Sequence, residues 1–268
     1  MSEWDATTFE AKDNLLSVLR TEADGMFALA EDPAAWTAAT ACTEWEVRDI
    51  VGHLVDTTEA YFVSFDAARG AGTAPDALGV RVFQGTADEG AKAFRGLSQD
   101  ELTQRLRGDF AKMMETFQGL GPDEWGGLMV PHKYMGPLPA FFYPVFQLMD
   151  YGVHSWDIRQ GAGQCHGLSG DTADLLTPFM FILWQATVTA TPEEQYDLGI
   201  RVQGHGDFRI SVGPEGLSYV ADDVTDLPTT IEFDPGTFVL TAFGRVNGGT
   251  IRGDRDVADR FLNQFFRI

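Results

Sequence analysis

Two histidines and one aspartate have the residue types and spacing that point most directly to chemistry. Asp150 and His154 are four residues apart, so on a helix they lie on one face, about 6 Å from each other. His53 stands at the edge of the apolar stripe of an earlier predicted helix, between Ile50 and Thr57. If these helices are neighbours, the three side chains converge. Two imidazoles and one carboxylate form the three-ligand set of catalytic zinc sites, which leave one position open.

The same residues also allow other interpretations. A histidine at the edge of a core is often hydrogen-bonded scaffolding, and an Asp–His pair four residues apart is often an ion pair on a helix surface. Two histidines and a carboxylate also describe non-haem Fe(II) oxygenases. Residue types and spacing alone leave these alternatives open.

The remaining candidate residues are expected to play lesser parts. His132 and Tyr134 lie in a Pro- and Gly-rich segment, where a surface loop is favoured over the alternative that they line a pocket mouth. Cys42 is expected to be a small core residue. His166 and His205 lie in Gly-rich connections and receive no role. The chain has no P-loop, HExxH or G-x-S-x-G motif. Four tryptophans are expected to anchor the core: Trp36, Trp45, Trp125 and Trp156.

Four amphipathic helices are predicted to position the candidate residues. Thr43, with Glu46 three residues later, resembles a capping box at the start of the second helix. Ser98 and Glu101 predict the start of the second half of the third helical region. Four such helices with connections of varied length suggest a bundle. The helical regions are expected at about residues 16–30, 43–65, 86–120 and 140–160, with a loop at 123–139.

The hydrophobic period changes to two after a helix predicted at residues 171–191. Strands are expected around residues 198–202, 208–212, 231–233 and 250–252, with short helices after Asp234 and Asp254. The predicted fold class is therefore α+β. A four-helix bundle is expected in residues 1–165, and a small α+β domain in residues 166–268.

Composition limits the binding partners and the cellular compartments that we expect for the protein. The 268 residues include 40 Asp and Glu against 19 Lys and Arg, a net charge of -21. This charge disfavours binding to nucleic acid and to anionic membranes. Cys42 and Cys165 are far apart and form no paired motif, which suits a reducing compartment. With a polar, acidic N-terminus and no long apolar run, the sequence predicts a cytoplasmic protein.

Two short motifs resemble those of the mycothiol-dependent maleylpyruvate isomerase family, within the wider DinB-like metal-binding bundles. The first is the segment TACTEWEVRDIVGHL, with Cys42, Trp45 and His53. The second is Asp150 and His154, followed by Trp-Asp at 156–157. The C-terminal part is also similar to the small domain of that family, which is similar to sterol-carrier folds. The resemblance spans nearly the whole chain.

The resemblance implies a metal site and a thiol cofactor. His53, Asp150 and His154 would hold a divalent ion, with zinc favoured, and mycothiol would supply the thiol. In the isomerase reaction the thiolate adds to a cis-enone such as maleylpyruvate, the former double bond rotates, and the thiol leaves to give the trans product. The family often has Glu where this chain has Asp150. The shorter side chain would draw the ion closer to the helix or weaken its binding.

The resemblance and the spacing assign roles to two more residues. Arg245, in TAFGRVNGG, resembles the substrate-binding arginine of the family, and a guanidinium there can hold a dicarboxylate with paired hydrogen bonds. Asp157 is expected either to orient His154 or to be solvated at a helix end.

The resemblance leaves the reaction open. The same machinery would serve an isomerase or a mycothiol S-transferase that conjugates electrophiles, so the expected partners are a small thiol and a small electrophilic substrate. The alternative is a non-enzymatic protein, in which the bundle holds a metal and the sterol-carrier-like domain binds an apolar ligand.

Overall fold

The computed structural model describes residues 2–164, 166–189 and 192–266. The chain divides into two compact units, Met1–Leu168 and Ser169–Ile268. Cys165, where the sequence places the domain boundary, lies outside the described residues. Among the described helices, none is both long and apolar enough to cross a membrane.

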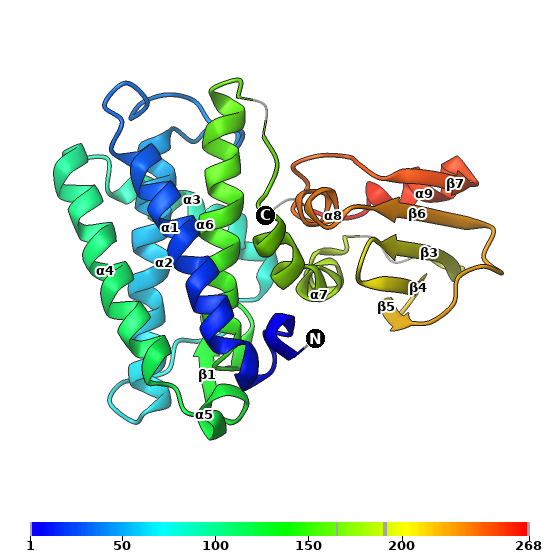
Figure 1. Cartoon of the computed structure of the whole chain (residues 1–268), viewed down its shortest axis with the longest axis horizontal. Helices are drawn as coiled ribbons and strands as arrows, with labels where there is room; N and C mark the ends of the chain where they lie inside the picture. The colour runs from blue at the N-terminus through cyan, green and yellow to red at the C-terminus, as the bar shows by residue number, and fades with distance from the viewer. Residues whose placement is uncertain (1, 165, 190–191, 267–268) are drawn as a thin grey trace. The chain divides into compact units, whose positions relative to one another are not determined.

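Four long helices build the first unit and confirm the predicted helical bundle (Figure 1). Helices α1 and α2 each pack against both α4 and α6. Helix α3 lies against α2, and α5 is a short turn of helix before α6. The bounds are α1 Lys12–Ala30, α2 Val47–Ala68, α3 Phe83–Ala93, α4 Gln99–Gly119, α5 Pro122–Gly127 and α6 Phe142–Gly161, with 3-10 turns η1 Ser2–Trp4, η2 Phe9–Ala11 and η3 Val80–Val82.

The start of α2 differs from the sequence prediction. The N-cap is Glu46, whose side chain pairs reciprocally with Asp49 in a capping box, so the expected box of Thr43 and Glu46 is wrong. A backbone bridge between Ala39 and Glu46 closes a turn over the residues between them, in which Glu44 has a φ of 73°, so the helix begins later. The predicted cap of α4 is confirmed, since the Ser98 hydroxyl accepts a hydrogen bond from the backbone N–H three residues later.

The segment 123–139 is not the loop that its Pro and Gly content predicted. It contains α5 and an antiparallel hairpin of β1 (Met129–His132) and β2 (Gly136–Pro139). His132 pairs with Gly136, whose φ of 76° suits glycine, so residues 133–135 form the tip. The hairpin packs on α2 through β1.

The third predicted helical region consists of two helices, α3 and α4.

The second unit is a five-stranded sheet with three helices. The strand order is β5-β4-β3-β6-β7, antiparallel except for the parallel pair β3 and β6. Ile200 of β3 faces Phe208 on one side and Ile231 on the other, which confirms three predicted strands. Strand β5 was not predicted. The bounds are α7 Gly170–Thr187, β3 Tyr196–Val202, β4 Gly206–Gly213, β5 Gly216–Ala221, β6 Thr229–Phe233, α8 Pro235–Ala242, β7 Thr250–Gly253 and α9 Arg255–Leu262.

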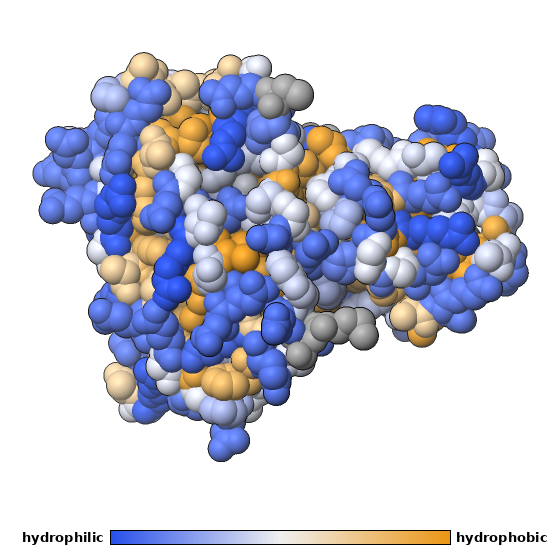
Figure 2. Space-filling model, in the orientation of Figure 1, coloured by the Kyte–Doolittle hydropathy of each residue, from blue (hydrophilic) through white to orange (hydrophobic). Residues whose placement is uncertain are grey.

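Aromatic rings fill the core of the second unit. Phe181 of α7 contacts rings of β4, β5 and α8, and Trp184 contacts Phe238 and Phe261 at ring-centroid distances of 5.1 and 5.0 Å. Helix α7 ends at Thr187, short of its predicted end; residues 190 and 191 lie outside the described part. Asp234 and Asp254 cap α8 and α9, as predicted. The face of each unit seen in Figure 2 is mostly hydrophilic, in keeping with the acidic composition.

Candidate metal centre and adjoining pocket

The N-terminal part of α2 presents His53 from a firmly held turn. Asp49, one turn earlier, is fully buried and accepts two hydrogen bonds of 2.7 Å from the Arg95 guanidinium. Burial raises the pKa of Asp49, but these hydrogen bonds outweigh it and leave the pKa below its usual value. Gly52 lets α3 approach closely, since a Cβ atom there would collide with the backbone carbonyl of Ala91. His53 therefore sits on a helix that is held by α3 and by Arg95, which follows it.

Helix α6 brings Asp150 and His154 to the same place. One ligand atom from each of these residues and one from His53 all lie within 4.8 Å of one another. His53 and His154 are 3 % and 8 % exposed, and the Asp150 side chain is 19 % exposed. The structure thus brings together the three residues that the sequence singled out, at a site shielded from bulk water.

The distances in this triad suit a shared ion better than direct contact. Nε2 of His53 is 3.7 Å from Oδ1 of Asp150, too far for a hydrogen bond. Two ligands of a tetrahedral zinc ion, each bound at roughly 2.1 Å, lie about 3.4 Å apart. Nδ1 of His53 is buried, and among the described residues no group bonds to it. A scaffold histidine would be hydrogen-bonded, so that interpretation does not hold for His53. Two imidazoles and a carboxylate at these distances fit a divalent metal.

Asp157 orients the second imidazole. Its side chain is fully buried, and Oδ2 lies 2.9 Å from Nδ1 of His154, which leaves Nε2 of His154 for a metal. A carboxylate on the far nitrogen is the usual support for a metal-binding histidine. The structure therefore excludes the solvated helix end considered for Asp157. The half-buried Cys42 thiol donates to the same Oδ2 at 3.1 Å, so this cysteine makes a polar contact beyond core packing.

Trp45 forms an aromatic wall beside the two imidazoles. Its ring centroid is 5.1 Å from that of His53 and 5.9 Å from that of His154. The indole N–H donates to Oδ1 of Asp88 on α3 at 2.9 Å, which fixes the ring. The sequence identified Trp45 only as a core anchor and as part of a motif. Its position eight residues before His53 was the available signal.

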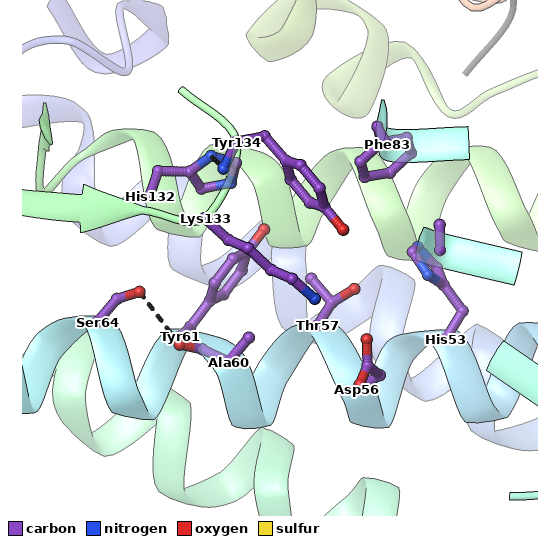
Figure 3. A pocket seen from close by; sticks show the side chains of 11 residues that line it. His53, Asp56, Thr57, Ala60, Tyr61, Ser64, Phe83, His132, Lys133 and Tyr134 are labelled. Atoms are coloured by element: carbon purple, nitrogen blue, oxygen red, sulfur yellow. Dashed lines mark hydrogen bonds between the residues drawn. The ribbon is translucent and has the colours of Figure 1, made fainter. Parts of the chain in front are cut away.

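A pocket that is open to solvent adjoins the triad and includes His53 in its lining (Figure 3). Successive turns of α2 form its floor, since Thr57, Tyr61 and Ser64 follow His53 on the same helix face. The hairpin tip and α3 supply the other walls. The remaining lining residues are Asp56, Ala60, Phe83, Ala87, His132, Lys133 and Tyr134.

His132 and Tyr134 belong to this pocket, so the predicted surface loop is wrong for them. Nδ1 of His132 accepts from the backbone N–H groups of Tyr134 and Met135, both at 3.3 Å. Burial lowers the pKa of His132 to about 4, so this imidazole is neutral at pH 7. The Tyr134 hydroxyl is 2.7 Å from that of Thr86 on α3, and its ring packs on Phe83. The hairpin, which the sequence did not predict, places these residues.

Arg245 belongs to the second unit. It follows α8, and Nη1 donates to the backbone carbonyl of Phe243 at 3.1 Å. The substrate-binding role that the resemblance implies for Arg245 stays a prediction. His205 pairs with Asp174 at 3.0 Å in the same unit.

Comparisons with known proteins identify a family and a shared fold. The family model of the mycothiol maleylpyruvate isomerase N-terminal domain matches residues 19–159, more than half of the chain and the part that contains the triad. A crystal structure of the mycothiol-dependent maleylpyruvate isomerase has a TM-score of 0.64 at 14% identity, covering 97% of this chain and 99% of that one. A histidine-to-alanine mutant of that enzyme matches with the same TM-score and coverage at 13% identity. At these identities the structures show a shared fold. A search of curated proteins finds no match. The chain belongs to the mycothiol maleylpyruvate isomerase family.

Proposed function

We propose that this protein is a metal-dependent enzyme that uses a small-molecule thiol, mycothiol, to attack an electrophilic substrate. The observation that carries the proposal is the convergence of His53, Asp150 and His154 within 4.8 Å, inside the region that matches the family. Such a reaction needs a site for the metal ion and a space for the electrophile. The triad fits the first and the adjoining pocket the second.

Each residue of the site has a definite part in the proposal. The two imidazoles and the Asp150 carboxylate would hold the ion, for which zinc is proposed. Such an ion, when bound, favours the thiolate form of a thiol at neutral pH. Asp157 holds the ring of His154 in place, and Trp45 excludes water from one side of the site. The pocket beside His53 receives the electrophile.

Isomerase and S-transferase activity share this thiol chemistry and differ in the fate of the adduct. An isomerase releases the thiol after the former double bond has rotated, whereas a transferase keeps the new carbon–sulfur bond. Of the two activities, we propose isomerisation of a cis-enone acid, because the name of the matched family includes that activity. Arg245 remains the proposed arginine for the substrate carboxylates, and the cytoplasm the proposed location.

The first experiment measures metal in protein purified without added metal and without an affinity tag. About one equivalent of zinc is expected. The His154→Ala variant should lose it, while His205→Ala, which changes a histidine of the second unit, should retain it. Iron in place of zinc would favour oxygen chemistry over thiol chemistry.

The second experiment adds mycothiol and a cis-enone acid to the metal-loaded protein. Thiol-dependent loss of the cis isomer, absent in His154→Ala, is expected. A protein that contains no metal and takes up no zinc at neutral pH would contradict the proposal, as would a metal-loaded protein that leaves both the enone and other electrophiles unchanged.

A further inference from the structure

We infer that Lys133 and Tyr61 form a carboxylate-binding subsite in the pocket beside the triad. The ligand class is a small organic acid bound in the first unit alone. The orientation of the ligand, with its reactive carbon towards the triad, rests on the proposed function. The binding of its carboxylate at Lys133 and Tyr61 does not.

Lys133 is a cation without a carboxylate partner among the described residues, and its ammonium group lies 5.5 Å from the centroid of the Tyr134 ring. Among the described residues, no carboxylate lies within ion-pair distance of its ammonium group, although the sequence has 40 acidic residues. By contrast, Lys92 pairs with Asp88 at 2.7 Å, and Lys12 donates two hydrogen bonds of 2.6 Å to backbone carbonyls. Figure 3 shows the Lys133 side chain reaching from the hairpin tip across the pocket towards α2. This cation is available to an anionic ligand.

The backbone around Lys133 is fixed. The carbonyl of Lys133 accepts from the N–H of Leu78 at 2.9 Å, and the carbonyl of Tyr134 accepts from Gly79 at 3.1 Å. The hairpin pairing below and the bond between Tyr134 and Thr86 hold the tip from two more sides. The backbone that carries Lys133 therefore starts from an ordered position, which reduces the entropy lost on binding.

Tyr61 offers a second donor to the same ligand. Its ring is 6 % exposed, and among the described residues its hydroxyl has no hydrogen-bond partner. Burial, together with the charge of Asp150, raises the pKa of Tyr61 well above its usual value, so the hydroxyl keeps its proton. A lysine ammonium and a neutral phenol are both donors, which matches the acceptor-only carboxylate.

The opposing charge in the lining is directed elsewhere. Asp56 is the acidic residue among the pocket-lining side chains, and its carboxylate packs on Gly90 of α3, where no Cβ atom would fit. His132 is neutral at pH 7 and adds no charge. We therefore place the acid group of the ligand at Lys133 and Tyr61.

Binding of succinate, an unreactive dicarboxylate, tests the inference without turnover. Isothermal titration at neutral pH, without thiol, compares succinate with its neutral diamide on the protein as purified. Lys133→Met should weaken succinate binding about tenfold or more, and Tyr61→Phe severalfold. Lys112→Met removes the same charge from α4, outside the pocket, and should have no such effect. Lys133→Arg should retain most of the affinity, which separates charge from folding.

Two results would overturn the inference: the unchanged protein binds succinate no better than the diamide, or Lys133→Met and Lys112→Met bind it equally. The titration is repeated on His154→Ala, in which the proposed metal site is broken. Dependence on Lys133 should persist there. Failure of the proposed function would appear as absent metal or absent turnover, which leaves the binding result intact.

Discussion

Nδ1 of His154 lies 2.9 Å from Oδ2 of Asp157, a fully buried carboxylate three residues later on α6. The contact fixes both the ring plane and the nitrogen that points towards His53 and Asp150. Because the carboxylate is inside the protein, water does not compete for it. Metal binding should therefore depend on Asp157, although Asp157 is not one of the three proposed ligands.

Asp157→Asn should lower the affinity for zinc about 10- to 100-fold, because an amide is a weaker and uncharged acceptor for the imidazole N–H. Competition with a chromogenic chelator measures the change. Asp24→Asn, an exposed position on α1, is the matched control. Equal affinities of the two variants for zinc would mean that Asp157 contributes to packing but not to metal binding.

Asp150 gives a second prediction, because the family often has glutamate at this position. Asp150→Glu keeps a carboxylate and should retain metal binding, whereas Asp150→Asn removes the anionic ligand and should bind zinc at least about tenfold more weakly. The same chelator assay ranks the three proteins. If Asp150→Asn binds zinc as well as the unchanged chain, the carboxylate is not a ligand and the triad is wrong.

Gly52 provides a structural test of the helix that carries His53. A methyl group there would collide with the carbonyl of Ala91 and lie 3.3 Å from the Phe94 ring. Gly52→Ala should therefore lower the free energy of unfolding by about 1–3 kcal/mol, although alanine is the better helix former. Urea unfolding measures it.

Gly108→Ala on α4 is the control for this substitution, since nothing lies within 4 Å of the added atom. It should stabilise the protein by up to about 1 kcal/mol. Equal effects at the two glycines would show that α2 and α3 are not in close contact.

The sequence predicted the fold class because it follows from local patterns, whereas the convergence of the triad also required α2 and α6 to be neighbours. Helical spacing placed Asp150 and His154 on one face, and apolar stripes identified the bundle helices. The start of α2 was mispredicted because a long-range bridge between Ala39 and Glu46 overrides the local signal at Thr43.

The pocket could not be predicted for a similar reason. Its lining depends on a hairpin in a segment with three prolines and three glycines, composition that local rules assign to loops. The burial of Asp157 and the position of Trp45 beside the two imidazoles are tertiary facts that helical spacing alone does not predict. Lys133 carries no motif at all; only the pocket gives it a potential role.

His132 makes the stability of the first unit sensitive to mild acid. Burial lowers its pKa in the folded protein to about 4, against 6.5 for an ordinary histidine. Between these values the unfolded chain binds a proton that the folded chain does not. The contribution of His132 is therefore complete above pH 6.5 and is lost as the pH falls towards 4, by at most about 1.4 kcal/mol per pH unit.

His132→Gln should flatten this part of the profile, because glutamine does not titrate and its carbonyl can still accept from the backbone N–H of Tyr134. Urea unfolding at pH 7, 6, 5 and 4.5 gives the two curves, with His205→Gln as the control for loss of a histidine in the second unit. The curve of His132→Gln should converge on that of the unchanged chain as the pH falls. Parallel curves would mean that His132 titrates normally in the folded protein, so that it would be charged in mild acid and would add to the positive charge of Lys133 beside the pocket.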